Sequence, residues 1–124
     1  MKVLICGDRD WTDSARIAYM LDRYHHQVSI RQVIEGAARG ADQMAGEIAS
    51  GMGIPVVEYP AQWGLYGKAA GNIRNQQMLD EGKPDFILAF HNDIQHSKGT
   101  KDMIARAKHK IPVILITSTD IRIL

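Results

Sequence analysis

The chain has 124 residues, which is the size of one domain, and its composition of 45% hydrophobic and 23% charged residues is ordinary for a soluble globular protein. The formal net charge of +1 gives no bulk attraction to nucleic acid or to an anionic membrane. The single cysteine, Cys6, excludes an intrachain disulfide, and its place in an apolar run indicates a small buried side chain rather than a reactive thiol. The apolar run before Gly7 is too short for a signal peptide, and no stretch is long enough to span a membrane, so we expect a cytoplasmic protein.

Short apolar runs alternate with helical periodicities along the chain. The apolar runs predict strands over residues 2–6, 32–35, 56–59, 85–90 and 112–116. Between them, the periodicities predict helices starting after Thr12 or Asp13, over residues 41–52, over 72–81 with Asn72 as cap, and over 100–107 with Thr100 as cap. Residues 60–71 are expected to be irregular, and residues 121–124 can add a short edge strand.

This order of elements predicts an α/β fold in one domain, residues 1–124. Strands that are apolar throughout are buried on both faces, and strands joined by helices pair in parallel. Right-handed crossovers then give a doubly wound, Rossmann-like domain with a five-stranded parallel sheet, order 3-2-1-4-5, and helices on both faces.

Three turns that join a strand to a helix carry glycine or arginine, and they are the most informative feature of the sequence. They read GDRDWTD (7–13), EGAARGAD (35–42) and a loop ending in SKGTKDM (97–103), while KAAGNIRNQQML (68–79) opens another helix. Such turns meet at the C-terminal edge of a parallel sheet, where helix N-termini attract anions, glycine lets backbone approach a ligand, and arginine supplies a planar donor fork. The sequence therefore predicts a site for a phosphorylated ligand. Its candidate binding residues are Gly7, Arg9, Asp10, Trp11, Gly36, Arg39, Gly40, Asp42, Arg74, Asn75, Gly99 and Thr100.

Each of these residues also has a purely structural interpretation. The glycines can simply make turns, and Asp42 can simply favour a helix dipole. Trp11 can stack on a base or cover the core, and Thr100 can be a plain helix cap. Arg39 and Arg74 are harder to explain, because a cation at a helix start is unfavourable without a partner.

An anion would supply that partner for both arginines. For Arg74 the alternative is a salt bridge to Asp10, Asp42 or Asp102. The five histidines lack partners at metal-ligand spacing, so we expect no metal site and no cofactor.

Together these motifs, in this order and spacing, resemble the SLOG superfamily, and most closely its small YspA-like branch of bacteria and phages. The resemblance implies a Rossmann-like fold and binding of a nucleotide or a nucleotide-derived, ADP-ribose-like ligand. It also extends to the LOG-type phosphoribohydrolases: Arg74 matches their catalytic arginine, and Gly99 and Thr100 match their Gly-Thr pair. Met103, however, stands at the position of their catalytic glutamate, with Asp102 one residue earlier.

The interpretation that we favour is a protein that senses or sequesters a nucleotide-derived small molecule. One alternative is a nucleotide N-glycosidase or phosphoribohydrolase that uses Arg74 with Asp102 or Asp42 as the carboxylate. Another alternative is single-stranded nucleic-acid binding, which requires a basic stripe with stacking aromatic side chains, whereas the basic residues here are scattered. The Ala- and Gly-rich helix over residues 41–52 permits close helix packing and so allows a homo-oligomer.

Overall fold

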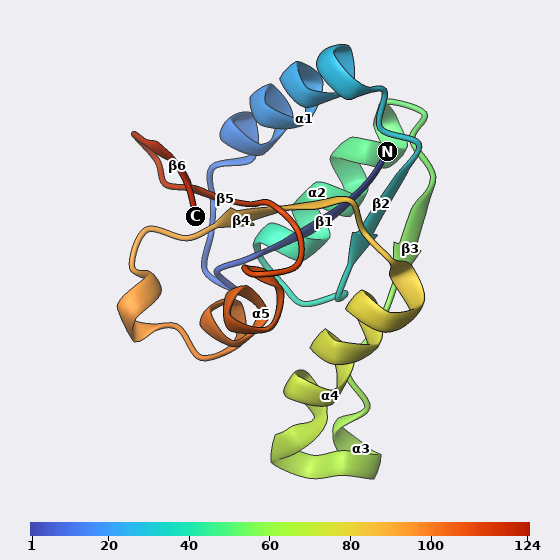
Figure 1. Ribbon diagram of the computed structural model, residues 1–124, viewed down its shortest axis with the longest axis vertical. Helices are drawn as coiled ribbons and strands as arrows, with labels where there is room; N and C mark the ends of the chain where they lie inside the picture. Colours follow the sequence, from blue (N-terminus) through green and yellow to red (C-terminus); the bar gives the residue numbers. More distant parts are fainter.

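Six strands form a single sheet in the computed structural model, which describes residues 1–124 (Figure 1). The strand order is β3-β2-β1-β4-β5-β6. Every neighbouring pair is parallel except β5 and β6, which are antiparallel. The strands are β1 (Lys2–Gly7), β2 (Gln32–Glu35), β3 (Val56–Glu58), β4 (Phe86–Phe90), β5 (Val113–Ile116) and β6 (Ile121–Ile123).

The predicted order of the five parallel strands is confirmed, and the sheet has one strand more than the five that were predicted. After β5 the chain turns within residues 117–120, where the Thr117 N–H donates to the Asp120 carbonyl at 3.0 Å. A turn this short can only return the chain antiparallel to the strand that it leaves. β6 therefore lies beside β5 at the edge of the sheet.

Helices cover both faces of the sheet, as predicted. On one face, α1 (Ser14–Val28) and α2 (Ala41–Gly51) bury apolar side chains such as Met20 and Ala45 against Val3 and Leu88. On the other face, α5 (Gly99–Ala107) and the π-helical turn η2 (Met78–Gly82) pack in a second core cluster with Leu4, Cys6 and Leu115. The alanines of α2 (Ala41, Ala45 and Ala49) thus lie within the chain's own core, and self-association stays a prediction. No helix combines the length and the hydropathy needed to cross a membrane.

The prediction for residues 60–71 was wrong. This stretch contains the short helix α3 (Trp63–Tyr66) and the 3-10 turn η1 (Gly67–Ala69), which lead directly into α4 (Ala70–Gln77). The amides of Leu65 and Tyr66 donate to the Gln62 carbonyl at 3.0 Å, so local hydrogen bonds hold α3. In Figure 1, α3 and α4 project from the sheet along the long axis of the molecule.

Helix starts were predicted with mixed success. The Asp13 carboxylate accepts from the Arg16 amide at 3.0 Å, so Asp13 caps α1 as expected. Before α5, a 3-10 turn η3 (Ile94–His96) leads to Ser97, whose hydroxyl accepts from the amide of Thr100 at 3.1 Å. Thr100 therefore lies inside α5 and does not cap it; Lys98 is at the cap position, and the Ser97 hydroxyl before it satisfies the first amides of the helix.

Candidate functional site

A cleft of about 600 Å³ lies at the C-terminal edge of the sheet, where β1 and β4 end side by side. The strand order reverses between these two strands, which is where ligands bind in open α/β sheets. Segments that are far apart in the sequence meet here: the loops after β1 and β4, the start of α5, and one side of α4. The lining residues are Gly7, Asp8, Arg9, Asp10, Arg39, Trp63, Lys68, Gly71, Asn72, Arg74, Asn75, His91, His96, Ser97, Lys98, Gly99 and Thr100.

A smaller cavity of about 420 Å³ adjoins this cleft. The two share four lining residues, Arg9, Arg39, Trp63 and Arg74. The walls that belong to the smaller cavity alone come from the β2–α2 loop and from the segment before α3. They are Gly36, Ala37, Ala38, Pro60 and Ala61.

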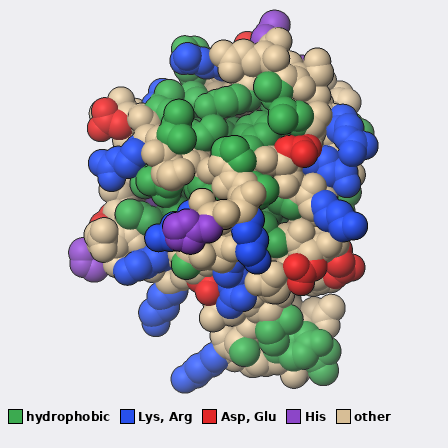
Figure 2. Space-filling view, viewed as in Figure 1, with side chains coloured by type: hydrophobic (Ala, Val, Ile, Leu, Met, Phe, Trp, Pro, Cys, Tyr) green, Lys and Arg blue, Asp and Glu red, His purple; other side chains and the backbone are tan.

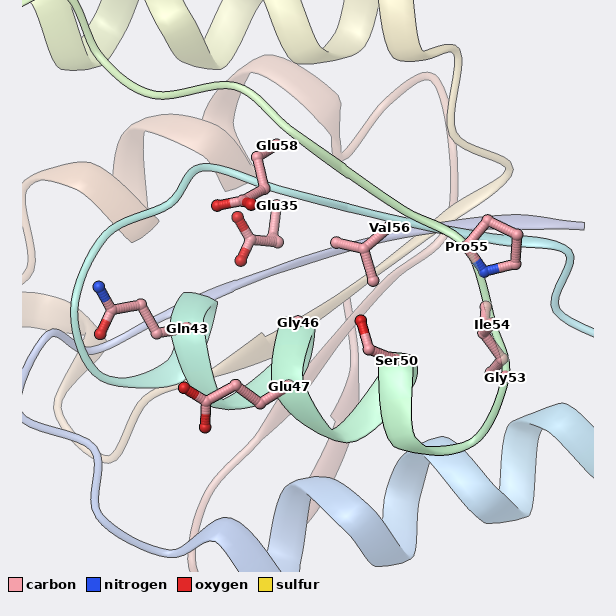
Figure 3. Close-up of a pocket in the computed structure, with 10 residues that line it drawn as sticks. All are labelled: Glu35, Gln43, Gly46, Glu47, Ser50, Gly53, Ile54, Pro55, Val56 and Glu58. Atoms are coloured by element: carbon pink, nitrogen blue, oxygen red, sulfur yellow. The ribbon is translucent and has the colours of Figure 1, made fainter.

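The charges of the cleft favour an anion. Five Lys and Arg side chains line it against two carboxylates, whereas the whole chain carries a net charge of only +1. A larger groove of about 940 Å³, between α2 and the edge strand β3, has the opposite character. It is lined by Glu35, Glu47 and Glu58 without any Lys or Arg, and Figure 3 shows the first and last of these next to each other. Volume alone would select the groove, but the electrostatics select the cleft as the anion site.

Arg74 lies fully within the protein yet keeps one face toward the cavities. It is 9% exposed, and its Nη1 donates to the carbonyls of Gly36 at 2.5 Å and Tyr59 at 3.4 Å. Its Nε donates to Asn75 Oδ1 at 3.1 Å. No buried polar side-chain atom lacks a partner, so Nη2, which makes no hydrogen bond, must be open to solvent. Burial lowers the pKa of Arg74, but a guanidinium stays protonated in proteins.

These contacts revise the expectation for Arg74. It is the fifth residue of α4, which begins at Ala70, so it does not lie in the first turn of a helix. It also forms no salt bridge with any of the three predicted aspartates. Backbone carbonyls hold it instead, which leaves its positive charge without a carboxylate in direct contact.

The loop after β2 is held from two sides at Gly36. The Asp42 carboxylate accepts from the amides of Gly36 at 3.1 Å and Ala38 at 3.4 Å, while Arg74 binds the Gly36 carbonyl. Burial raises the pKa of Asp42 to about 6, with Arg74 and the two amides opposing that rise. A Cβ at Gly36 would collide with the Arg74 guanidinium, so this close approach requires glycine. Ala37 follows with φ of 58°, a left-handed conformation that is uncommon for alanine and is typical of strained functional loops.

Two exposed pairs lie at the mouth of the cleft. Arg39 Nη2 contacts Asp10 Oδ1 at 3.1 Å, and both side chains are largely exposed, which makes this a weak ion pair that an anion can replace. The Arg9 guanidinium lies over the Trp63 ring, 5.6 Å from its centroid. Further in, His91 Nε2 lies 3.9 Å from Asp8 Oδ2.

The start of α5 forms the opposite wall. Asn75 Nδ2 donates to the Gly99 carbonyl at 3.1 Å and to Asp102 Oδ2 at 3.0 Å. The same Asp102 oxygen accepts from Arg106 Nε at 2.8 Å, and Asp102 does not line the cleft. Met103 is completely buried in the core cluster beneath α5. Of the two positions on this helix considered for a catalytic carboxylate, Asp102 is thus hydrogen-bonded to neighbouring side chains, and Met103 is a core residue.

Nine of the twelve predicted binding residues line one of the two cavities. They are Gly7, Arg9, Asp10, Gly36, Arg39, Arg74, Asn75, Gly99 and Thr100. Three do not. Trp11 is 4% exposed and packs edge-on against Phe90, with ring centroids 5.6 Å apart, so it covers the core. Gly40 (φ 78°) would place a Cβ against the carbonyls of Asp8 and Arg9, and Asp42 holds the β2–α2 loop.

Several lining residues were not among the predicted binding residues. Asp8 and His91 directly follow the ends of β1 and β4, and position at a strand end is the signal that could have identified them. Three more lining residues come from α3, η1 and the first turn of α4: Trp63, Lys68 and Asn72. The sequence pattern did not predict α3 or η1. His96, Ser97 and Lys98 belong to the loop before α5.

The fold and the cleft define this protein as a Rossmann-like α/β domain with a cationic cleft at the switch point of its sheet. Residues 1–66 match the YAcAr family, the YspA, cpYpsA-related SLOG family, and the chain belongs to that family. It is 38% identical over 120 residues to the Gene 61 protein of Mycobacterium phage D29, a match that covers 91% of this chain and 94% of the phage protein.

Among solved structures, the chain resembles phosphoribosylglycinamide formyltransferase from Bacillus halodurans, with a TM-score of 0.50 and 18% identity. That match covers 92% of this chain but only 55% of the formyltransferase chain. At this identity the likeness supports the Rossmann-like fold and nothing about activity.

Proposed function

We propose that this protein binds a nucleotide or a nucleotide-derived, ADP-ribose-like ligand in the cationic cleft. It would act in the cytoplasm of a bacterium or a phage-infected cell as a sensor or sequestering protein. The observation that carries the proposal is the meeting of three arginines, Arg9, Arg39 and Arg74, in the wall shared by the two cavities. Ligand binding of this kind is also what the SLOG resemblance implies.

The three guanidinium groups differ in what they can offer to a phosphate. Arg74 is anchored by backbone carbonyls and presents Nη2, so it is a preorganised donor. Arg9 and Arg39 are held only by an aromatic ring and an exposed carboxylate, so they can turn toward a ligand at low cost. The amide end of α5, beside Gly99 and Thr100, adds a partial positive charge on the opposite wall.

The proposal favours binding over catalysis. Glycoside cleavage requires a carboxylate that faces the sugar, and neither of the two predicted candidates, Asp42 and Asp102, lines the cleft. Of the two carboxylates that do line it, Asp10 is paired with Arg39 at the exposed mouth, and Asp8 lies beside His91. Single-stranded nucleic acid is also less favoured, because Trp63 is the one hydrophobic side chain among the residues that line the cleft, and successive bases need several stacking platforms.

The direct test is calorimetric titration of the protein with AMP and with ADP-ribose. We expect both to bind, and we expect Arg39→Ala to weaken binding by roughly 1.5–3 kcal/mol, the value of a charge-assisted hydrogen bond. Arg39 is preferred to Arg74 for this test, because removing Arg74 would also leave the carbonyls of Gly36 and Tyr59 without their donor.

The matched control is Arg31→Ala. Arg31 is an exposed arginine that precedes β2 and so lies at the other edge of the sheet. Its replacement should leave both affinities unchanged. The proposal is refuted if neither nucleotide binds at millimolar concentration, or if Arg39→Ala binds both as tightly as the wild-type protein does.

A further inference from the structure

The two adjoining cavities differ in chemical character, and that difference has a consequence for how a ligand would lie in them. The larger cleft has one hydrophobic lining residue, Trp63, among many charged and polar ones. The smaller cavity has no carboxylate in its lining, and apart from the shared arginines its walls are Gly36, Ala37, Ala38, Pro60, Ala61 and the same tryptophan. A nucleotide has the same division between a charged phosphate and a flat, weakly polar base.

Trp63 lies where the two cavities join, and its surroundings are those of a stacking platform. Trp63 is 48% exposed, in keeping with a short helix, α3, that buries none of its residues. A Cβ at Gly71 on α4 would lie 3.4 Å from Trp63 Cη2, so the glycine lets the indole rest close to α4. The Arg9 guanidinium carbon lies over the ring, 5.6 Å from its centroid, so this face of the indole is not packed against the core.

Resting on the proposed function, we infer that Trp63 is the base-stacking residue and that the smaller cavity receives the base. A planar base and a planar guanidinium use the same aromatic surface, since nucleic-acid bases stack on aromatic rings and on arginine planes alike. The base takes the place of Arg9 on the indole. Arg9 then turns to the phosphate, beside Arg39 and Arg74, with which it already shares both cavities.

This exchange links recognition of the two ends of the ligand. A bare phosphate leaves Arg9 on Trp63 and meets two arginines, whereas a nucleotide frees Arg9 and meets three. The base therefore contributes to affinity through stacking and also by releasing a guanidinium for the phosphate. Discrimination between a nucleotide and its phosphoribosyl fragment follows from the aromatic platform.

The experiment compares AMP with ribose 5-phosphate, which keeps the phosphate and sugar but has no base. Loss of one stacking aromatic weakens binding by roughly 5- to 100-fold, so Trp63→Ala should weaken AMP binding by that factor. Ribose 5-phosphate should bind to the variant at least as tightly as to the wild-type protein, because no stacking is lost and the indole no longer holds Arg9 away from the phosphate. Trp63→Phe, which keeps a stacking ring, should retain most of the AMP affinity.

Tyr66→Ala is the matched control. Tyr66 is an exposed aromatic residue on the same short helix, but it lines neither cavity. Figure 2 shows hydrophobic side chains on the surface of this projecting segment, so an effect of general apolar surface would appear in the control as well. Because Trp63 is half exposed, Trp63→Ala should fold normally, and its thermal unfolding midpoint checks this directly.

Each outcome separates the inference from the function on which it rests. If wild-type protein binds AMP and Trp63→Ala binds it equally well, the stacking assignment is wrong while nucleotide binding stands. If Trp63→Ala loses AMP and ribose 5-phosphate to the same extent, Trp63 acts on the phosphate end and the base assignment is again wrong. If wild-type protein binds neither compound, the proposed function is wrong, and the stacking assignment that rests on it is wrong as well.

Discussion

Replacing Glu35 with glutamine should remove a large part of the dependence of stability on pH that we expect for the wild-type protein below neutrality. Glu35 ends β2 and is only 2% exposed, beneath the acidic groove of Figure 3. One of its oxygens accepts from the Ala37 amide at 2.7 Å. The other lies so close to α2 that a Cβ at Gly46 would be 2.9 Å away. Burial raises the pKa of Glu35 from 4.5 to about 7, with smaller rises from Asp42 and Glu58 and opposing effects of the Ala37 amide and Arg74.

The sign of the effect follows from which state holds the proton. Between pH 4.5 and about 7 the folded protein keeps the Glu35 proton and the unfolded chain releases it. The free energy of unfolding must therefore fall as pH rises through this window. The full shift corresponds to about 3 kcal/mol, at about 1.4 kcal/mol for each pH unit. Asp42, with its pKa raised to about 6, adds a fall in the same direction at lower pH, which Glu35→Gln leaves in place.

Urea unfolding of wild-type and Glu35→Gln protein, followed by circular dichroism from pH 4 to pH 8, measures the difference. Glutamine has the size of the protonated acid and can still accept from the Ala37 amide. The two proteins should be about equally stable near pH 4, and the variant should be more stable by up to about 3 kcal/mol near pH 8. Glu47→Gln, an exposed change in the same groove, should follow the wild-type profile. A constant difference between wild-type and Glu35→Gln protein across the whole pH range would refute this reasoning.

Two further predictions concern the stability of two glycine variants and the absence of AMP hydrolysis. Gly40→Ala should lower the free energy of unfolding by about 1–3 kcal/mol or more, because of its positive φ and the carbonyls that a Cβ would meet. Gly99→Ala, where a Cβ meets open space, should change it by less than about 0.5 kcal/mol, and equal losses in the two variants would contradict the argument. Incubation with AMP should release no adenine above the uncatalysed rate. Release detected by chromatography at about 1 s⁻¹ or faster, and abolished by Asp102→Asn, would show an enzyme instead.

The parts of the fold that could be predicted from the sequence are those in which burial leaves a pattern. Uniformly apolar runs such as residues 86–90 and the spaced apolar residues of α2 identify a doubly wound sheet and its order. The strand-to-helix turns then fall at one edge by geometry, so nine of the twelve predicted binding residues line the cavities, although other lining residues were not predicted. The α3 segment could not, because it buries no residue and has no apolar period to detect.

The details of the site depend on contacts between distant residues. Arg74 is held by carbonyls that lie 38 and 15 residues away in the chain, so its anchoring cannot be read from its local sequence. Trp11 had two equal interpretations until the structure placed it against Phe90 at the end of β4. Thr100 is not the cap of α5, because the helix already begins at Gly99, and the Ser97 hydroxyl accepts from the Thr100 amide instead.

The positions of Asp42 and Asp102, the two carboxylates considered for catalysis, support the proposal of a binding protein. Asp42 accepts two backbone amides and so fixes the loop that carries Gly36, and Asp102 is bound by Asn75 and Arg106 and so ties α4 to α5. Both carboxylates thus position residues that line the cleft without lining it themselves. These contacts hold Asp42 and Asp102 away from the cavities, so the carboxylates that a ligand would meet are Asp8 and the exposed Asp10, which is paired with Arg39. Five Lys and Arg side chains line the cleft around them, a balance of charge that stabilises a phosphate.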